Sequence, residues 1–134
     1  MKYLAEYTAG PIEDAMATSG AFFAFGTEQF EARANPRFNY TRLGMGLICP
    51  VDTAAQLTAD LAKIHIQGIK DDIADNGLNA IVIRELNNYE CYYTGDPEDA
   101  ILALELYPVS KEDILKVFKN KHYEPDLREP ELQK

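Results

Sequence analysis

The sequence predicts an α+β protein, in which a small antiparallel three-stranded sheet lies among about six helices in one helix-rich domain. Apolar residues recur at helical spacing over much of the chain, above all in a long central helix at about residues 52–76. Short aromatic or β-branched runs predict strands at about residues 21–25, 44–49 and 90–94. No repeat or linker divides the sequence, so we expect one domain over 1–122, followed by an extended or mobile acidic, Pro-containing tail over 123–134.

The first third of the chain predicts two helices around a strand. Pro11 suits the first position of a short helix, which Gly20 would end. The aromatic run 21–25 is typical of a buried strand. Thr27 can then cap a second helix that ends near Ala34, directly before Asn-Pro.

The central helix follows the second strand. The glycines of strand 44–49 would let another backbone approach closely, and Pro50 would end the strand. Asp52 or Thr53 can cap the long helix. Its apolar stripe indicates that it forms the centre of the core. Two neighbouring rows make up the stripe: Leu57, Leu61, Ile64 and Gly68, then Ala62, Ile66, Ile69 and Ile73.

The last third continues with residues 78–88, whose apolar spacing favours a helix with Arg84 and Glu85 on its polar side. In strand 90–94, alternation would place Cys91 on the core face, between two tyrosines. Two further helices are expected to start at the acidic turns Asp96-Pro97-Glu98-Asp99 and Ser110-Lys-Glu-Asp113, the second with Ile114, Leu115 and Phe118 inward.

The net charge of −9 favours a protein partner with a basic surface and argues against direct binding of nucleic acid. Asp71, Asp72 and Asp75 lie at the end of the long helix, where negative charge opposes the helix dipole. A partner's positive charge could relieve this repulsion, and so could Arg37 or Arg42 within the chain, which we prefer.

The ordinary patterns of catalytic and metal sites are incomplete. His65 has no second ligand at metal-binding spacing, and the acidic stretch 71–77 lacks two ligand positions of a calcium loop. Gly44-Met-Gly46 lacks phosphate-loop spacing. Cys49 and Cys91 are interpreted as buried thiols of a cytoplasmic protein, since no export signal or membrane-length apolar run is present. We therefore expect no cofactor, metal or membrane association, and no catalytic residue can be assigned.

Three segments, "AFFAFGTEQF", "GMGL" and "ELNNYECYYTGDPEDAILAL", resemble an uncharacterised family of small domains from bacteria and their phages. The resemblance spans roughly residues 20–118. Members carry an Asn-His-Glu core followed by Thr-Gly-Asp, and Tyr89 stands here in place of the His. The matching residues are Asn88, Glu90, Thr94, Gly95 and Asp96. The resemblance implies a phage or mobile-element context and no established activity.

Three hypotheses about function follow. The first is a non-enzymatic acidic interaction protein that binds a host protein, with a DNA mimic or anti-defence protein as one version. The second is a binder of a small polar ligand or nucleotide, or a small enzyme, centred on residues 87–94. The third is a minor structural subunit of a virion or complex, anchored by exposed tyrosines such as Tyr3, Tyr7 and Tyr123; the oligomeric state is left open. The candidate binding residues are Asn87, Asn88, Glu90, Tyr92 and Asp96.

Overall fold

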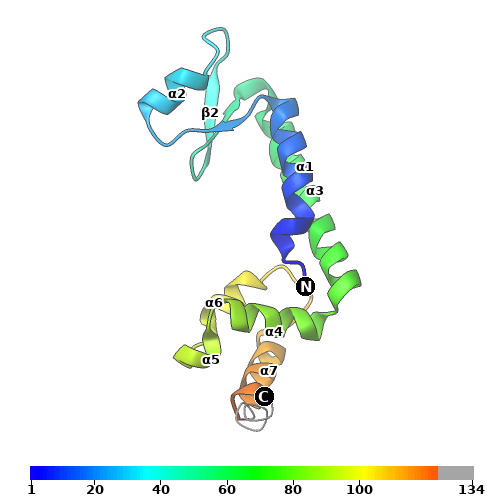
Figure 1. The fold of residues 1–134 in the computed structure, drawn as a ribbon. Coiled ribbons are helices and arrows are strands. Elements are labelled where there is room, and N and C mark those ends of the chain that lie inside the picture. Colours follow the sequence, from blue (N-terminus) through cyan, green and yellow to red (C-terminus); the bar gives the residue numbers. More distant parts are fainter. Residues whose placement is uncertain (124–134) are drawn as a thin grey trace. The chain divides into compact units, whose positions relative to one another are not determined.

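The computed structural model describes the backbone of residues 1–123 and the side chains of residues 1–120, so most of the predicted tail lies outside it. The chain is α+β, with seven helices and one three-stranded antiparallel sheet in the described part (Figure 1). It divides into two compact units, residues 1–71 and residues 72–134, and the division falls within the long helix α3.

The first unit begins with helix α1, Leu4–Ser19, which starts earlier than predicted. The carboxylate of Glu6 accepts a hydrogen bond from the Tyr3 amide at 2.9 Å and so closes the first turn. Pro11 therefore lies inside the helix rather than at its start. Gly10 precedes it and has no Cβ to meet the proline ring, which makes a helical Pro easier to accommodate. Gly20 ends α1 in the left-handed region, as expected.

The sheet consists of β1 (Phe22–Phe23), β2 (Tyr40–Gly44) and β3 (Leu47–Pro50), in the order β1-β3-β2. The prediction of one strand over 44–49 was wrong, because Met45 and Gly46 have φ of 52° and 83° and reverse the chain. Two consecutive positive φ angles are typical of a tight hairpin turn. The basic segment before this turn forms β2, which the sequence did not reveal.

Helix α2, Thr27–Arg33, covers one face of this sheet. Its N-cap is Gly26, so Thr27 is already in the helix, and Ala34 is the C-cap. Phe30 and Ala34 pack against the buried side chains of Phe22, Ala24 and Ile48. The run 21–25 is only half buried, because its alternate residues Phe23 and Phe25 face solvent.

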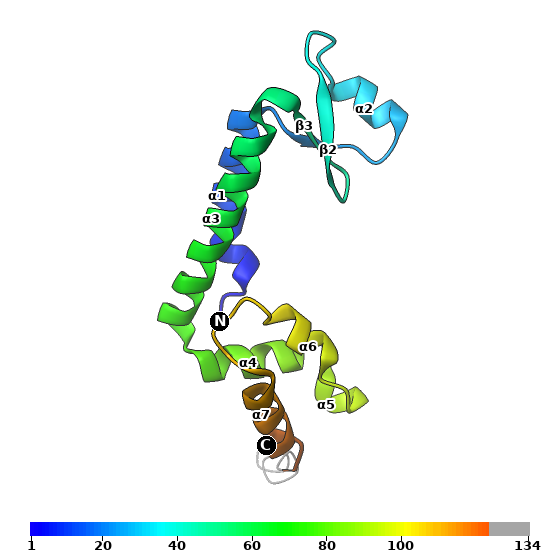
Figure 2. The same ribbon diagram turned by 180° about the vertical axis from the view of Figure 1, so that it is seen from behind.

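Helix α3, Val51–Asn76, confirms the predicted long helix. Within the first unit it runs beside α1 in both views (Figures 1 and 2). Gly68 permits this contact, since a Cβ built there would lie 2.5 Å from Cγ2 of Thr8. The first apolar row is inward, with Leu57 fully buried. The second row is only partly inward, because Ile66 is exposed.

Neither predicted cap of α3 acts as one, because the helix begins at Val51, ahead of both Asp52 and Thr53. The hydroxyl of Thr53 instead donates to the carbonyl of Ser19 at 2.7 Å, across the end of α1. The same hydroxyl lies 3.4 Å from the buried thiol of Cys49. Thr53 thus links three elements of the first unit rather than capping its own helix.

The second unit contains α4 (Leu78–Asn88), α5 (Cys91–Thr94), α6 (Glu98–Ala103) and α7 (Lys111–Tyr123). Helices α5, α6 and α7 all contact α4. The predicted helix at 78–88 is confirmed, and Ser110 caps α7 by accepting a hydrogen bond from the Asp113 amide at 3.0 Å. The apolar interior comprises Ile81, Val82, Leu86, Cys91, Ala100, Leu104, Ile114 and Phe118.

The predicted third strand at 90–94 was wrong. Glu90 adopts a left-handed conformation with φ 54°, after which Cys91–Thr94 form a single helical turn that Gly95 closes. A helical turn carries every side chain to a different direction, so the alternation expected for a strand is lost. Cys91 is buried as predicted, whereas Tyr93 is 88% exposed. The sheet's third strand is β2 instead.

Candidate functional site

The five residues proposed from the sequence lie at the end of α4 and around α5, and they differ in their surroundings. Asn87, Asn88 and Glu90 are exposed. Tyr92 is half-buried and its ring stacks on that of Phe118, with centroids 5.4 Å apart. The carboxylate of Asp96 accepts a hydrogen bond from the Glu98 amide at 3.0 Å, which gives it a local structural role at the start of α6.

The second unit also contains a buried ionic cluster, which lies apart from these five residues. The guanidinium of Arg84 donates two hydrogen bonds to the carboxylate of Asp72, at 2.8 and 2.9 Å, and a third to Glu85 at 2.7 Å. The hydroxyl of Tyr107 donates to Asp72 at 2.5 Å, and Asn76 donates to it at 2.8 Å. Arg84 and Glu85 are both buried, so placing them on the polar side of α4 was wrong.

The ionic cluster also shows that the prediction of which residue offsets the negative charge at the end of α3 was wrong. Asp72 is neutralised by Arg84, and not by Arg37 or Arg42. Burial by itself would raise the pKa of the Asp72 carboxyl, but the hydrogen bonds from Arg84, Tyr107 and Asn76 outweigh it and hold that pKa below its usual value. Burial and the bond to Asp72 raise the pKa of the Tyr107 phenol. These groups hold one another in fixed protonation states, which suits a structural role.

Other reactive side chains in the described residues offer little for chemistry. Burial raises the pKa of the Cys91 thiol, and the nearby acids Asp99 and Asp96 add to this shift, so the nucleophilic thiolate is disfavoured. Residues 1–120 contain no group of three or more His, Cys, Asp or Glu side chains placed to hold a metal ion. Among the described helices, none combines the length and apolarity needed to cross a bilayer.

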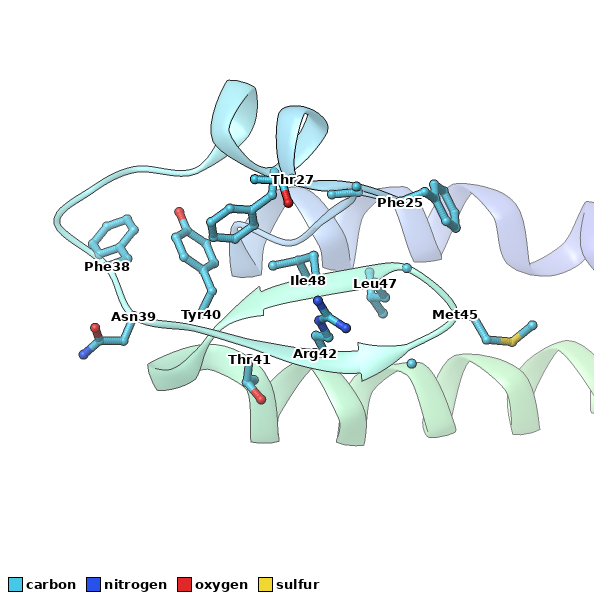
Figure 3. Close-up of a pocket in the computed structure, with 15 residues that line it drawn as sticks. Phe25, Thr27, Phe38, Asn39, Tyr40, Thr41, Arg42, Met45, Leu47 and Ile48 are labelled. Atoms are coloured by element: carbon cyan, nitrogen blue, oxygen red, sulfur yellow. The ribbon is translucent and has the colours of Figure 1, made fainter.

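The first unit carries a cleft of about 770 Å³ between the β2–β3 hairpin and the segment that leads from β1 into α2 (Figure 3). This volume lies within the usual range of small-ligand sites. Ile48 and Ala24 form its buried floor, and Phe30 and Tyr40 form part of its wall. We call it the aromatic cleft. Its fifteen lining residues are Ala24, Phe25, Gly26, Thr27, Phe30, Phe38, Asn39, Tyr40, Thr41, Arg42, Gly44, Met45, Gly46, Leu47 and Ile48.

Three large apolar side chains on the rim of the aromatic cleft face solvent. Phe25 is 74% exposed, Phe38 is 53% exposed and Met45 is 93% exposed. Phe38 and Met45 mark the two ends of the hairpin (Figure 3). Phe23 is also exposed and stacks parallel to Phe25, at 6.3 Å between centroids. Large apolar side chains that remain in water around a concavity are typical of a binding surface.

Contacts within the first unit position two of these rim residues, Phe25 and Phe38. The ring of Phe25 lies over Gly46, where a Cβ would come within 2.3 Å of it. The Phe25 amide donates to the side chain of Gln29 at 2.7 Å. At the other end, Phe38 packs edge-on against Tyr40, whose hydroxyl accepts a hydrogen bond from the Asn35 amide at 2.8 Å. A surface that is ordered before binding loses less entropy when a partner binds.

The electrostatic character of the aromatic cleft differs from that of the chain as a whole. Its lining includes one cation, Arg42, and no Asp or Glu, although the chain has 22 acidic residues. Arg42 pairs with Ile48 across the hairpin and therefore shares the Tyr40 face of β2. It is exposed, and it forms no ion pair with the residues that the structure describes.

Sequence reasoning missed the aromatic cleft, although the sequence contains a signal for it. Residues 32–51 include three Arg and no acid, in a chain of net charge −9. The aromatic run 21–25 gave no such signal, because all five of its residues are apolar and predict a fully buried strand. What the sequence could not show was the turn at Met45-Gly46 that brings the two segments together.

These features define an α+β protein with an exposed aromatic cleft on its N-terminal unit. The chain belongs to a family of unknown function, DUF7659, whose model matches residues 5–124. Comparison with curated proteins and with solved structures finds no match.

Proposed function

We propose that this protein is a non-enzymatic interaction protein that binds another protein through the aromatic cleft. The observation that carries the proposal is the exposure of Phe25, Phe38 and Met45 around a concave surface. Aromatic and Met side chains are the residue types most enriched at protein interfaces. Burying a large apolar side chain is worth about 1.5–3 kcal/mol, so three of them could supply much of the affinity of a moderate complex.

The cleft proposal is tested by recovering partners on immobilised protein. The variant Phe25→Ser/Met45→Ser removes two apolar side chains from the rim. A matched control, Ile66→Ser/Leu102→Ser, removes two exposed apolar side chains from helices α3 and α6, outside the cleft. We expect a partner that binds the wild type and the control and is lost with the rim variant. Identical recovery by all three proteins would contradict the proposal.

The net charge supports a second feature of the partner, a basic surface, and with it the version in which the protein acts as a DNA mimic. In that version it would occupy the nucleic-acid site of a host nuclease or restriction complex in the host cytoplasm. The family resemblance at Asn88 and Glu90, which implies phages and mobile elements, motivates this anti-defence setting. Inhibition of such a complex that weakens steeply with added salt would support it. Unchanged nuclease activity at low salt would remove it.

The alternative site, a polar ligand at residues 87–94, is favoured by the exposed pair Asn87 and Asn88 beside the left-handed Glu90. A thermal-shift screen with metals and nucleotides tests it, because a ligand that binds only the folded state raises its stability. Saturable stabilisation that Glu90→Gln abolishes would favour this site over the aromatic cleft.

A further inference from the structure

The aromatic cleft can be assigned a more definite occupant from its shape and charge. We propose that it binds an extended segment of a partner protein, in which an apolar side chain enters the cleft and a carboxylate two residues away pairs with Arg42. This inference rests on the proposed function and specifies the kind of partner.

The position of β2 supports an extended occupant. β2 lies at an edge of the sheet, because the order is β1-β3-β2 and β3 alone pairs with it. The cleft is lined by consecutive residues of this strand, Tyr40, Thr41 and Arg42, although Thr41 points away from Tyr40 (Figure 3). The cleft therefore reaches the backbone of the strand as well as one face of it. An exposed edge can add a peptide strand through main-chain hydrogen bonds.

The spacing of Tyr40 and Arg42 sets the expected pattern in the partner. They are two residues apart and share one face of β2, so the residues of an added strand that lie opposite them are also two apart. Near Tyr40 the surface is apolar, with Phe30 and Phe38 in edge contact with its ring. An apolar side chain fits there, and an acidic side chain fits opposite Arg42.

Charge favours a peptide with a single well-placed carboxylate over a nucleic-acid strand. The lining supplies one guanidinium, whereas single-stranded nucleic acid is bound along grooves that contact successive phosphates. The net charge of −9 repels a polyanion far more than it repels one carboxylate. A guanidinium that lies beside an apolar surface can form a charge-assisted pair with that carboxylate.

The test selects binders from a displayed library of random dodecapeptides on the full-length protein. We expect enriched peptides to carry Asp or Glu two positions from a large apolar residue. For a synthetic peptide of that sequence, Arg42→Gln should weaken binding by about three- to tenfold. Arg37→Gln, an exposed Arg outside the lining, serves as the matched control and should leave binding unchanged. When the same library is selected on the Arg42→Glu variant, the enriched peptides should carry Lys or Arg at the position where the wild type selects Asp or Glu.

Three results would overturn the inference: no enriched pattern, an enriched pattern indifferent to Arg42→Gln, or binding of oligothymidylate that depends on Arg42. Arg42 is exposed, and circular dichroism of each variant checks that its replacement leaves the fold intact. Failure here is distinguishable from failure of the proposed function. If Phe25→Ser/Met45→Ser abolishes partner recovery while no acidic pattern is selected, the cleft binds a partner of other chemistry.

Discussion

Asp72 is a single carboxylate that accepts hydrogen bonds from Arg84, Tyr107 and Asn76 while it is completely buried. These partners come from α3, from α4 and from the segment after α6. A buried ion pair contributes little net stability over an apolar replacement, but removing one partner leaves the other charge without compensation. The ionic cluster therefore makes the second unit sensitive to single substitutions within it.

We expect Asp72→Asn to lower the free energy of unfolding by about 3–5 kcal/mol, because the Arg84 charge stays buried without its main anion. Urea unfolding followed by circular dichroism measures this loss. Asp71→Asn is the matched control, since the neighbouring carboxylate is exposed and accepts a hydrogen bond from the exposed Gln67. The control should change stability by less than about 0.5 kcal/mol. Equal effects of both substitutions would contradict a structural role for the ionic cluster.

The lowered pKa of Asp72 also predicts how stability depends on acid. Its contribution is fully present above the pKa of an unfolded Asp, about 4, and is lost as the pH falls through the lower folded value. The stability difference between wild type and Asp72→Asn should thus be constant near neutral pH and should shrink below about pH 4. Urea unfolding at a series of acidic pH values tests this. If the stability difference between the two proteins grows as the pH falls, the pKa of Asp72 is not lowered by folding.

The residue scale was the hardest to predict from the sequence. The acids at the end of α3 indicated a need for positive charge, which proved correct, but Arg84 lies twelve positions along the chain on a separate helix. Helical spacing placed it with the polar residues of α4, since periodicity ranks Arg as polar wherever it lies. Only the packing of α4 against neighbouring elements buries that side of the helix.

Among the elements, the contact of α1 with α3 depends on the absence of a side chain at Gly68. We expect Gly68→Ala to lower the free energy of unfolding by about 1–3 kcal/mol, because the added methyl would lie 2.5 Å from Cγ2 of Thr8. Thermal unfolding of Gly68→Ala, Thr8→Ala and the double variant tests this. The double variant should be more stable than additive effects predict, since Thr8→Ala removes the clash. Strict additivity would exclude the steric explanation.

The hairpin turn offers a paired test of how the rim of the cleft is held. Gly44 and Gly46 both have positive φ, so Ala at either position strains the backbone by about 1 kcal/mol or more. A Cβ at Gly46 would also meet the Phe25 ring, whereas one at Gly44 meets nothing within 4 Å. Nuclear Overhauser contacts between that ring and residue 46 should be present in the wild type and in Gly44→Ala. They should be lost in Gly46→Ala, because the added methyl displaces the ring. Their absence from the wild type would mean that Phe25 does not lie over the turn.

Helices with a long apolar stripe were predicted more reliably from the sequence than short segments. The long helix at 51–76 and the helices at 78–88 and 111–123 were predictable, because each has a sustained apolar stripe. Two short segments were predicted wrongly, 44–49 and 90–94, and 90–94 is the clearer case. Four residues can satisfy either a strand or a single helical turn, and the left-handed Glu90, not the local pattern, decided between them.

For the whole molecule, charge and exposed apolar surface act in opposite directions on solubility. The net charge of −9 keeps copies apart at neutral pH, and it vanishes near the pI of about 4.6. We expect light scattering to show self-association near that pH. Phe25→Ser/Met45→Ser should reduce it, because those side chains form much of the exposed apolar rim. If Ile66→Ser/Leu102→Ser reduces scattering equally, the rim is not the surface that associates.

The exposed position of Phe25, which stacks on Phe23, also suits a fluorescent probe. The chain contains eight tyrosines and no tryptophan, so it has no tryptophan absorption or fluorescence. Phe25 lies at the mouth of the aromatic cleft with most of its ring in water, where a larger indole can be accommodated. A single Trp at this position would be the only tryptophan in the protein. The wavelength of its fluorescence maximum would report whether water or a bound partner occupies the cleft.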